Sequence, residues 1–233
     1  MPRPASQRRP AARWLTALGT ALLALALMGA PAGASALSAD PASNYPEQIP
    51  PVCATAPRSV QCTQAGIVEL DQARVGEGRR PYRLPSDFLG LSGAHQLVVL
   101  TNLDRAANRQ RMIPGTTAAL DRAALAGARA GGDPIVTNPD LSWAANWAGD
   151  FPAAVWAYLA WMYDDGYGGP NLDCPIPAAP GCWGHRHDIL ARFPRGGTLE
   201  MGAADLDNAS YTMIIAQSLR RTPVHYAYRF ARR

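Results

Sequence analysis

The hydrophobic pattern of this chain changes once, and that change constrains the fold more than any other feature. Up to about residue 190, apolar residues recur mainly at spacings of three and four, as they do on one face of a helix. The later runs TLEMGAAD and ASYTMIIAQS are strand-like, and Leu206-Asp207-Asn208 between them is a hairpin signal. Helices followed by antiparallel strands predict the α+β class.

Four segments carry the helical signal. The first ends near Gly76 and has apolar residues from Ile67 to Val75, and the second is SGAHQLVVLTNLDRAANRQRM. The third is AALDRAALAGARAGG, which Thr116-Thr117 can cap, and the fourth is FPAAVWAYLAWMYDDG. The tail at 223–233 alternates between apolar and polar residues, which is typical of an extended segment.

The first 36 residues have the layout of a secretory signal peptide. Four arginines precede an apolar run from about residue 14 to residue 28, and Ala34-Ser35-Ala36 forms an Ala-x-Ala cleavage site. A membrane anchor is the alternative, but the apolar run is short for a spanning helix. We expect a signal peptide at 1–36, an extended arm at 37–63 and one domain at 64–233. The mature chain would then have no transmembrane segment.

Removing this leader also removes the basic charge. The chain has a formal net charge of +4, and the leader carries four arginines and no acid, so the mature charge is 4 − 4 = 0. A neutral domain gives no electrostatic reason to expect a nucleic-acid partner.

The four cysteines form two local pairs, Cys53 with Cys62 and Cys174 with Cys182. An even number of cysteines in an exported chain predicts disulfides, and four cysteines allow three pairings. We favour the local pairing because each pair flanks a proline-containing loop. A zinc site is the alternative, but the sequence lacks the usual C-x₂-C spacing.

The stretch GCWGHRHDIL contains His185 and His187, and the helix before it ends in Asp164-Asp165. Two histidines two apart share a face on a strand but diverge on a helix, so a metal site here would need a strand and a third ligand. Adjacent carboxylates at a helix C-terminus face the negative end of the helix dipole and need a partner. An arginine, a calcium ion or hydrogen bonds from loop amides would each serve, and Arg186 is the natural partner.

The order of NLDR, ANWAG, WMYDDG, GCWGHR and a hairpin containing MGAA resembles the CAP superfamily. This superfamily contains the cysteine-rich secretory proteins, antigen 5, the pathogenesis-related proteins and the bacterial SCP-like extracellular domains. The resemblance is greatest to actinobacterial-type members and covers about residues 67–218. It implies an α-β-α sandwich with a central cavity, secretion, and no single shared activity.

Better-known members carry a cavity tetrad of two histidines and two glutamates that can hold a divalent cation. In this chain the resemblance places Thr101, Asn146-Trp147 and a position near Leu159 where three of these ligands would stand, and it retains only His185. We therefore expect no cofactor, with a divalent cation as the alternative. Asp164 or Asp165 is the conjectured replacement for a lost ligand.

We expect a cavity lined by His185, Asn146, Trp147 and Trp183, with Arg186 beside it. The missing acid/base set favours a non-enzymatic protein, secreted or in the cell envelope, that binds an extracellular lipid, glycan or protein. Two alternatives are a cell-wall or peptide hydrolase that uses His185 with Asp164 or Asp165, and a purely structural extracellular domain. The sequence contains no G-x-S-x-G, H-E-x-x-H or phosphate-loop motif.

Overall fold

A computed structural model describes residues 39–218 and 223–231, so the predicted signal peptide lies outside the described residues. The helices are α1 (Pro51–Thr55), α2 (Val60–Gly76), the 3₁₀ turn η1 (Phe88–Gly90), α3 (Gly93–Ala107), α4 (Ala118–Ala130), α5 (Ala154–Tyr163) and α6 (Gly184–Ile189). The strands are β1 (Gly115–Thr116), β2 (Leu141–Ala148), β3 (Thr198–Leu206), β4 (Ser210–Ser218) and β5 (Tyr228–Arg229).

The strands form one five-stranded sheet in the order β2-β4-β3-β1-β5. All neighbouring pairs are antiparallel except β1 with β3. The predicted hairpin is β3–β4, in which Leu206 pairs with Ser210 and Thr198 pairs with Ser218. Ala209 closes the turn with φ at 61°. The predicted α+β class is confirmed.

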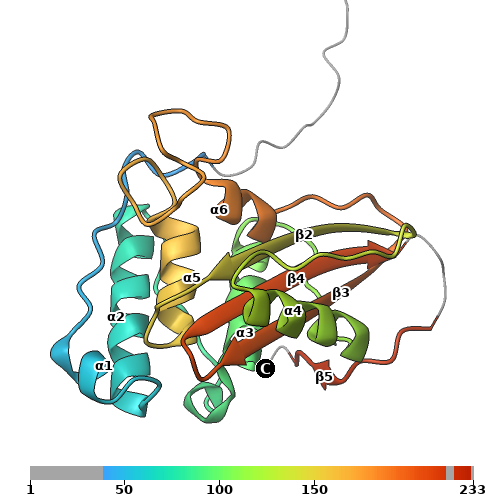
Figure 1. The fold of residues 1–233 in the computed structure, drawn as a ribbon, viewed down its shortest axis with the longest axis horizontal. Coiled ribbons are helices and arrows are strands. Elements are labelled where there is room, and N and C mark those ends of the chain that lie inside the picture. Colours follow the sequence, from blue (N-terminus) through green and yellow to red (C-terminus); the bar gives the residue numbers. More distant parts are fainter. Residues whose placement is uncertain (1–38, 219–222, 232–233) are drawn as a thin grey trace, which may run out of the picture. The chain divides into compact units, whose positions relative to one another are not determined.

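Different helices cover the two faces of the sheet (Figure 1). On β4, Ile214 and Ala216 pack with the alanine-rich α4, whereas Met213 and Ile215 pack into a second core with α3 and α5. This alternation is the two-residue period of a strand buried on both faces. A Cβ at Gly202 would clash with the backbone of Leu120, so this glycine allows α4 to lie close to β3. The layers are therefore helix, sheet and helix.

Helix α5 is the centre of the larger core. All ten of its residues are buried, and it packs against α2, α3 and α6. A helix that is apolar on every side is stable only when protein surrounds it, which explains why the run AVWAYLAWMY occurs inside the molecule. Its C-terminal end carries Asp164 and Asp165 into the region of the candidate site.

Two local predictions were wrong. The segment 37–63 is not extended throughout, because α1 begins at Pro51 and α2 begins at Val60, where Ser59 accepts a hydrogen bond from the Cys62 amide (3.2 Å). Ser59 is thus an N-cap that lengthens the first predicted helix. Thr117 occupies the N-cap position of α4, but its hydroxyl donates to Glu200 (3.0 Å) instead of capping the helix.

Both local disulfides are present, Cys53–Cys62 between α1 and α2, and Cys174–Cys182 in the loop before α6. Disulfides are typical of proteins from oxidising compartments, including the extracellular space. Within the described residues, no helix combines the length and the apolar character that a membrane span requires.

Removal of the Cys174–Cys182 disulfide should lower stability, because the unfolded chain gains conformational entropy. For Cys174→Ala with Cys182→Ala we expect a loss of about 2–3 kcal/mol in the free energy of unfolding, as estimated for a loop of about this length. Urea denaturation measures this loss. The matched variant Cys53→Ala with Cys62→Ala should lose more, because those two side chains are fully buried and their removal also leaves a cavity. Equal stability of wild type and the Cys174/Cys182 variant would contradict the expectation.

Candidate functional site

A cavity of about 610 Å³ lies at the C-terminal end of α5. Its walls come from the arm before α1, the loop after α4, the end of β2, the loop at 170–173 and His185 of α6. This volume falls within the range of small-molecule sites. Segments from the arm at Glu47 to α6 at His185 therefore share one hollow.

The central feature of the site is a hydrogen-bonded pair, His185 and Asp165. The His185 Nδ1 lies 2.6 Å from Asp165 Oδ1, and the other carboxylate oxygen accepts the backbone amides of His185 (2.9 Å) and Arg186 (3.4 Å). Because a carboxylate accepts, Nδ1 donates to Asp165 in this pair, and Nε2 is an acceptor when the imidazole is neutral. The Trp161 ring stacks beside the imidazole, with the ring centroids 6.5 Å apart.

The surroundings shift the pKa of both partners. Burial alone would lower the pKa of His185, but the hydrogen bond and the charge of Asp165 outweigh it, so the pKa is raised. Burial raises the pKa of Asp165, and the hydrogen bonds from His185 and the loop amides partly offset this effect. The hydrogen bond therefore orients the imidazole and favours its protonated form.

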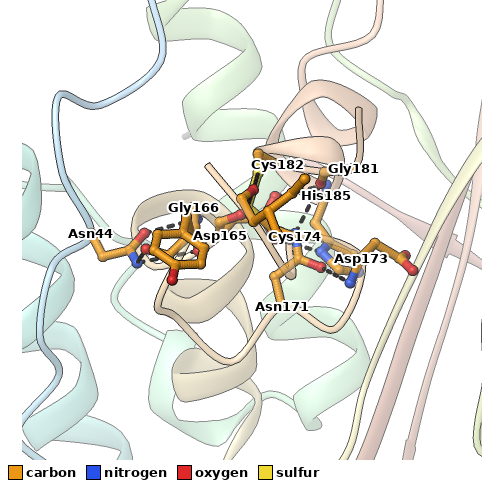
Figure 2. Close-up of a disulfide and its surroundings, with 11 residues drawn as sticks. Asn44, Asp165, Gly166, Asn171, Asp173, Cys174, Gly181, Cys182 and His185 are labelled. Atoms are coloured by element: carbon orange, nitrogen blue, oxygen red, sulfur yellow. Dashed lines mark hydrogen bonds and ion pairs between the residues drawn. A yellow bond between two sulfur atoms is a disulfide. The ribbon is translucent and has the colours of Figure 1, made fainter. Parts of the chain in front are cut away.

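The loop between the two partners is tied back to the end of α5. The Trp183 amide donates to the Asp165 carbonyl (3.0 Å), and the Asn171 side chain donates to the carbonyls of Asp165 and Gly181 (2.9 Å each) (Figure 2). The disulfide between Cys174 and Cys182 closes the same loop. The short helix α6 therefore begins at a fixed position relative to Asp165.

The predicted cavity residues divide into two groups. His185, Trp147, Asp164 and Asp165 line the cavity, whereas Asn146 and Trp183 are not among the described residues that line it. Asn146 is instead fully buried, and its amide donates to the His185 carbonyl (2.9 Å), which fixes α6 against β2. The aromatic ring of Trp183 lies beside Gly166.

The contact of Arg186 with the aspartates is made by its backbone amide, which donates to Asp165 (3.4 Å). Its side chain reaches other partners. Its guanidinium lies 3.0 Å from Glu77, the C-cap residue of α2, and donates to the Met162 carbonyl (2.5 Å). Successive residues of a helix point about 100° apart, so His185 and Arg186 reach different neighbours. His185 takes the carboxylate of Asp165, and Arg186 joins α6 to α2 and α5.

The second aspartate, Asp164, faces a carboxyl group that sequence reasoning missed. Glu47 of the arm also lines the cavity, and burial, followed by the charges of Asp164 and Glu69, raises its pKa to about 7. Burial and the charge of Asp165 raise the pKa of Asp164 to about 6. Glu47 stands in an aperiodic proline-rich segment, where no sequence signal indicated a contact with α5.

The arm is held in place by specific hydrogen bonds. The Tyr45 amide donates to the Tyr163 carbonyl (2.7 Å), and the Asn44 side chain both donates to the Gly166 carbonyl (3.2 Å) and accepts from the Gly166 amide (2.8 Å) (Figure 2). Tyr45 also donates to Glu69 (2.7 Å). These contacts make the arm part of the cavity wall.

The residues at the positions that the resemblance assigns to metal ligands make structural contacts here. Thr101 is buried with its hydroxyl against the Met213 sulfur (3.8 Å), and Leu159 is fully buried in the core. His187 points away from His185 and pairs with Asp40 (2.8 Å), as expected for residues two apart on a helix. In the described part of the chain, no group of three or more His, Cys, Asp or Glu side chains is placed to hold a metal ion.

The chain matches no protein-family model, no curated protein and no solved structure. A functional conclusion therefore rests on the geometry and chemistry of the cavity.

The raised carboxyl pKa values predict that stability falls as pH rises. Glu47 and Asp164 bind protons more tightly in the folded protein than in the unfolded chain, so their contribution is present near pH 4 and is lost up to about pH 7. We expect each group to contribute about 1 kcal/mol after solvent screening, which is about 2–4 °C in the thermal midpoint. Thermal unfolding at pH 4.5, 6 and 7.5 measures this, and Glu47→Gln should flatten the dependence. A midpoint that rises over this interval would contradict the prediction.

Proposed function

We propose that this chain is an exported, CAP-like binding protein that holds an extracellular or cell-envelope ligand, a lipid, glycan or protein group, in the cavity at the end of α5. The observation that carries the proposal is the cavity itself, which is large enough for a small ligand and has a fixed imidazole and two tryptophans in its wall. Such a combination of apolar surface with a few placed polar groups is typical of binding sites.

The helix-sheet-helix layers support the CAP-like architecture, and the two disulfides support an extracellular location. The side chains at the tetrad positions support binding in preference to metal-dependent chemistry. Thr101 and Leu159 are buried in the core, and the Asn146 amide donates to the His185 carbonyl of α6.

The test is ligand capture by the intact mature chain. Cell-envelope lipid and glycan fractions should raise the thermal midpoint of the wild type, and native mass spectrometry should identify the bound species. His185→Ala should reduce this shift, whereas His187→Ala, an exposed imidazole outside the cavity, should leave it unchanged. If no fraction shifts the midpoint of the wild type, the binding proposal fails.

One observation favours a hydrolase as the second candidate. The Asp165–His185 hydrogen bond orients an imidazole toward a cavity that also holds Asp164, whose pKa is raised to about 6. Nε2 could then take a proton from an attacking water, while the Asp164 carboxyl supplies one to the leaving group. Turnover of peptidoglycan or casein that is lost in His185→Ala and Asp164→Asn would favour this function over binding alone.

A purely structural role predicts a different outcome for the same variants. In that case His185→Ala lowers the free energy of unfolding but alters neither ligand capture nor turnover.

A further inference from the structure

The cavity at the end of α5 carries an excess of negative charge. Among the described residues that line it, one is a histidine and none is an arginine, although the chain contains 22 basic residues, all of them arginine. Six of the lining residues are carboxylic acids: Glu47, Asp133, Asp150, Asp164, Asp165 and Asp173. A hollow with walls of one sign concentrates ligands of the opposite sign.

Three of these acids lie close enough together for the charge of one to oppose the ionisation of the next. The charge of Asp164 contributes to the raised pKa of Glu47, and Asp165 contributes to that of Asp164. Glu47 Oε2 is buried and has no hydrogen-bond partner among the described residues. A buried acceptor oxygen without a donor costs free energy, and a cationic donor placed between Glu47 and Asp164 would remove that cost.

The remaining walls are aromatic and apolar. Trp147, Trp161 and Phe151 line the cavity, and the faces of such rings attract cations. At its edge lie Ile49 and Leu172, which are 45% and 86% exposed. Solvent-exposed apolar side chains beside a hollow mark surface that a ligand can cover. A cavity of about 610 Å³ is also far larger than a bare ion requires.

We infer that the cavity binds a small organic cation with an apolar body, such as a protonated amine, whose charged group lies between Glu47 and Asp164 and whose apolar part covers the tryptophans, Ile49 and Leu172. This inference rests on the proposed binding function and specifies the chemistry of the ligand. It also gives the arm a role, since Glu47 and Ile49 come from that segment.

Isothermal titration of the intact mature chain at pH 7.5 tests the inference, with phenethylammonium as the probe and 2-phenylethanol as its neutral analogue. We expect the amine to bind at least about tenfold more tightly, because a charge-assisted hydrogen bond is about twice as strong as a neutral one. Glu47→Gln and Asp164→Asn should each weaken amine binding about tenfold. Asp207→Asn removes the same charge from a fully exposed turn outside the cavity and should leave binding unchanged.

Three results would overturn the inference. They are equal affinity for the amine and the alcohol, unchanged amine binding in a folded Glu47→Gln or Asp164→Asn variant, and calcium binding at the same carboxylates without amine binding. A different result separates the inference from the proposed function. If the wild type binds the alcohol or a neutral envelope lipid in preference to the amine, and His185→Ala abolishes that binding, the inference fails but the proposed binding function stands. If neither the probes nor the envelope fractions bind, both fail.

Discussion

Arg186→Met should lower the free energy of unfolding by about 3–5 kcal/mol, the cost of breaking a buried ion pair. Arg186 is 1% exposed, its guanidinium lies 3.0 Å from Glu77, and it donates to the Met162 carbonyl. Methionine fills much of the volume but supplies no donor, so the Met162 carbonyl loses a partner and Glu77 loses one of the two arginines that contact it. Urea denaturation measures the loss.

The same variant should also disturb the site. Arg186 joins α6 to α2 and α5, and the neighbouring residue on α6 is His185. We therefore expect the His185 imidazole resonance to shift in NMR titrations. Arg79→Met is the matched control, because Arg79 contacts the same carboxylate (3.2 Å) but lies nearer the surface, where such pairs contribute about 1 kcal/mol or less. If both variants lose equally little stability, Arg186 does not hold α6 in place.

Asp104→Ala should have an effect of similar size, at a second buried ion pair in the same core. Asp104 is fully buried, pairs with Arg74, and accepts hydrogen bonds from Tyr82 (2.5 Å) and Tyr158 (2.8 Å). Removing the carboxylate leaves the buried Arg74 guanidinium without its counter-charge and removes the acceptor of two phenol hydrogen bonds. We expect a loss of about 3–5 kcal/mol in urea denaturation.

Two controls distinguish the charge from the hydrogen bonds. Tyr158→Phe removes one hydrogen bond and should cost about 1–3 kcal/mol. Arg74→Leu combined with Asp104→Leu removes both charges and should be less destabilised than Asp104→Ala, because no uncompensated ion remains. A double variant that is less stable than Asp104→Ala would show that packing, not the ion, causes the loss.

The elements that the sequence predicted are those with a strong local signal. Helices α3, α4 and α5 and the β3–β4 hairpin have apolar periods, caps or turn residues that act over a few positions. Strand β2 escaped prediction because LSWAANWA contains no β-branched apolar residue. It becomes a strand by pairing along its whole length with β4, about 70 residues away.

In the candidate site too, the residues with a local sequence signal were predicted and those placed by tertiary contacts were not. His185 and the two aspartates stand in recognisable motifs, whereas Glu47 enters the cavity only through the tertiary contacts of Asn44 and Tyr45. The NLDR motif is visible in the sequence, but the contacts of its arginine are not. Arg105 donates to the carbonyls of Ile189 and Ala191 (2.9 and 3.0 Å) and so fixes the end of α6, which no pattern of sequence spacing could indicate.

In the loop between Asp165 and His185, the residues that position the imidazole differ from those that face the solvent. The base of the loop is fixed by hydrogen bonds from Trp183 and Asn171, and by a disulfide, while Leu172 and Ile176 at its surface contact little. Substitutions at those outer positions can therefore accumulate without moving the imidazole. Related chains with the same anchor residues could diverge in what they recognise simply by exchanging this one short, self-contained segment.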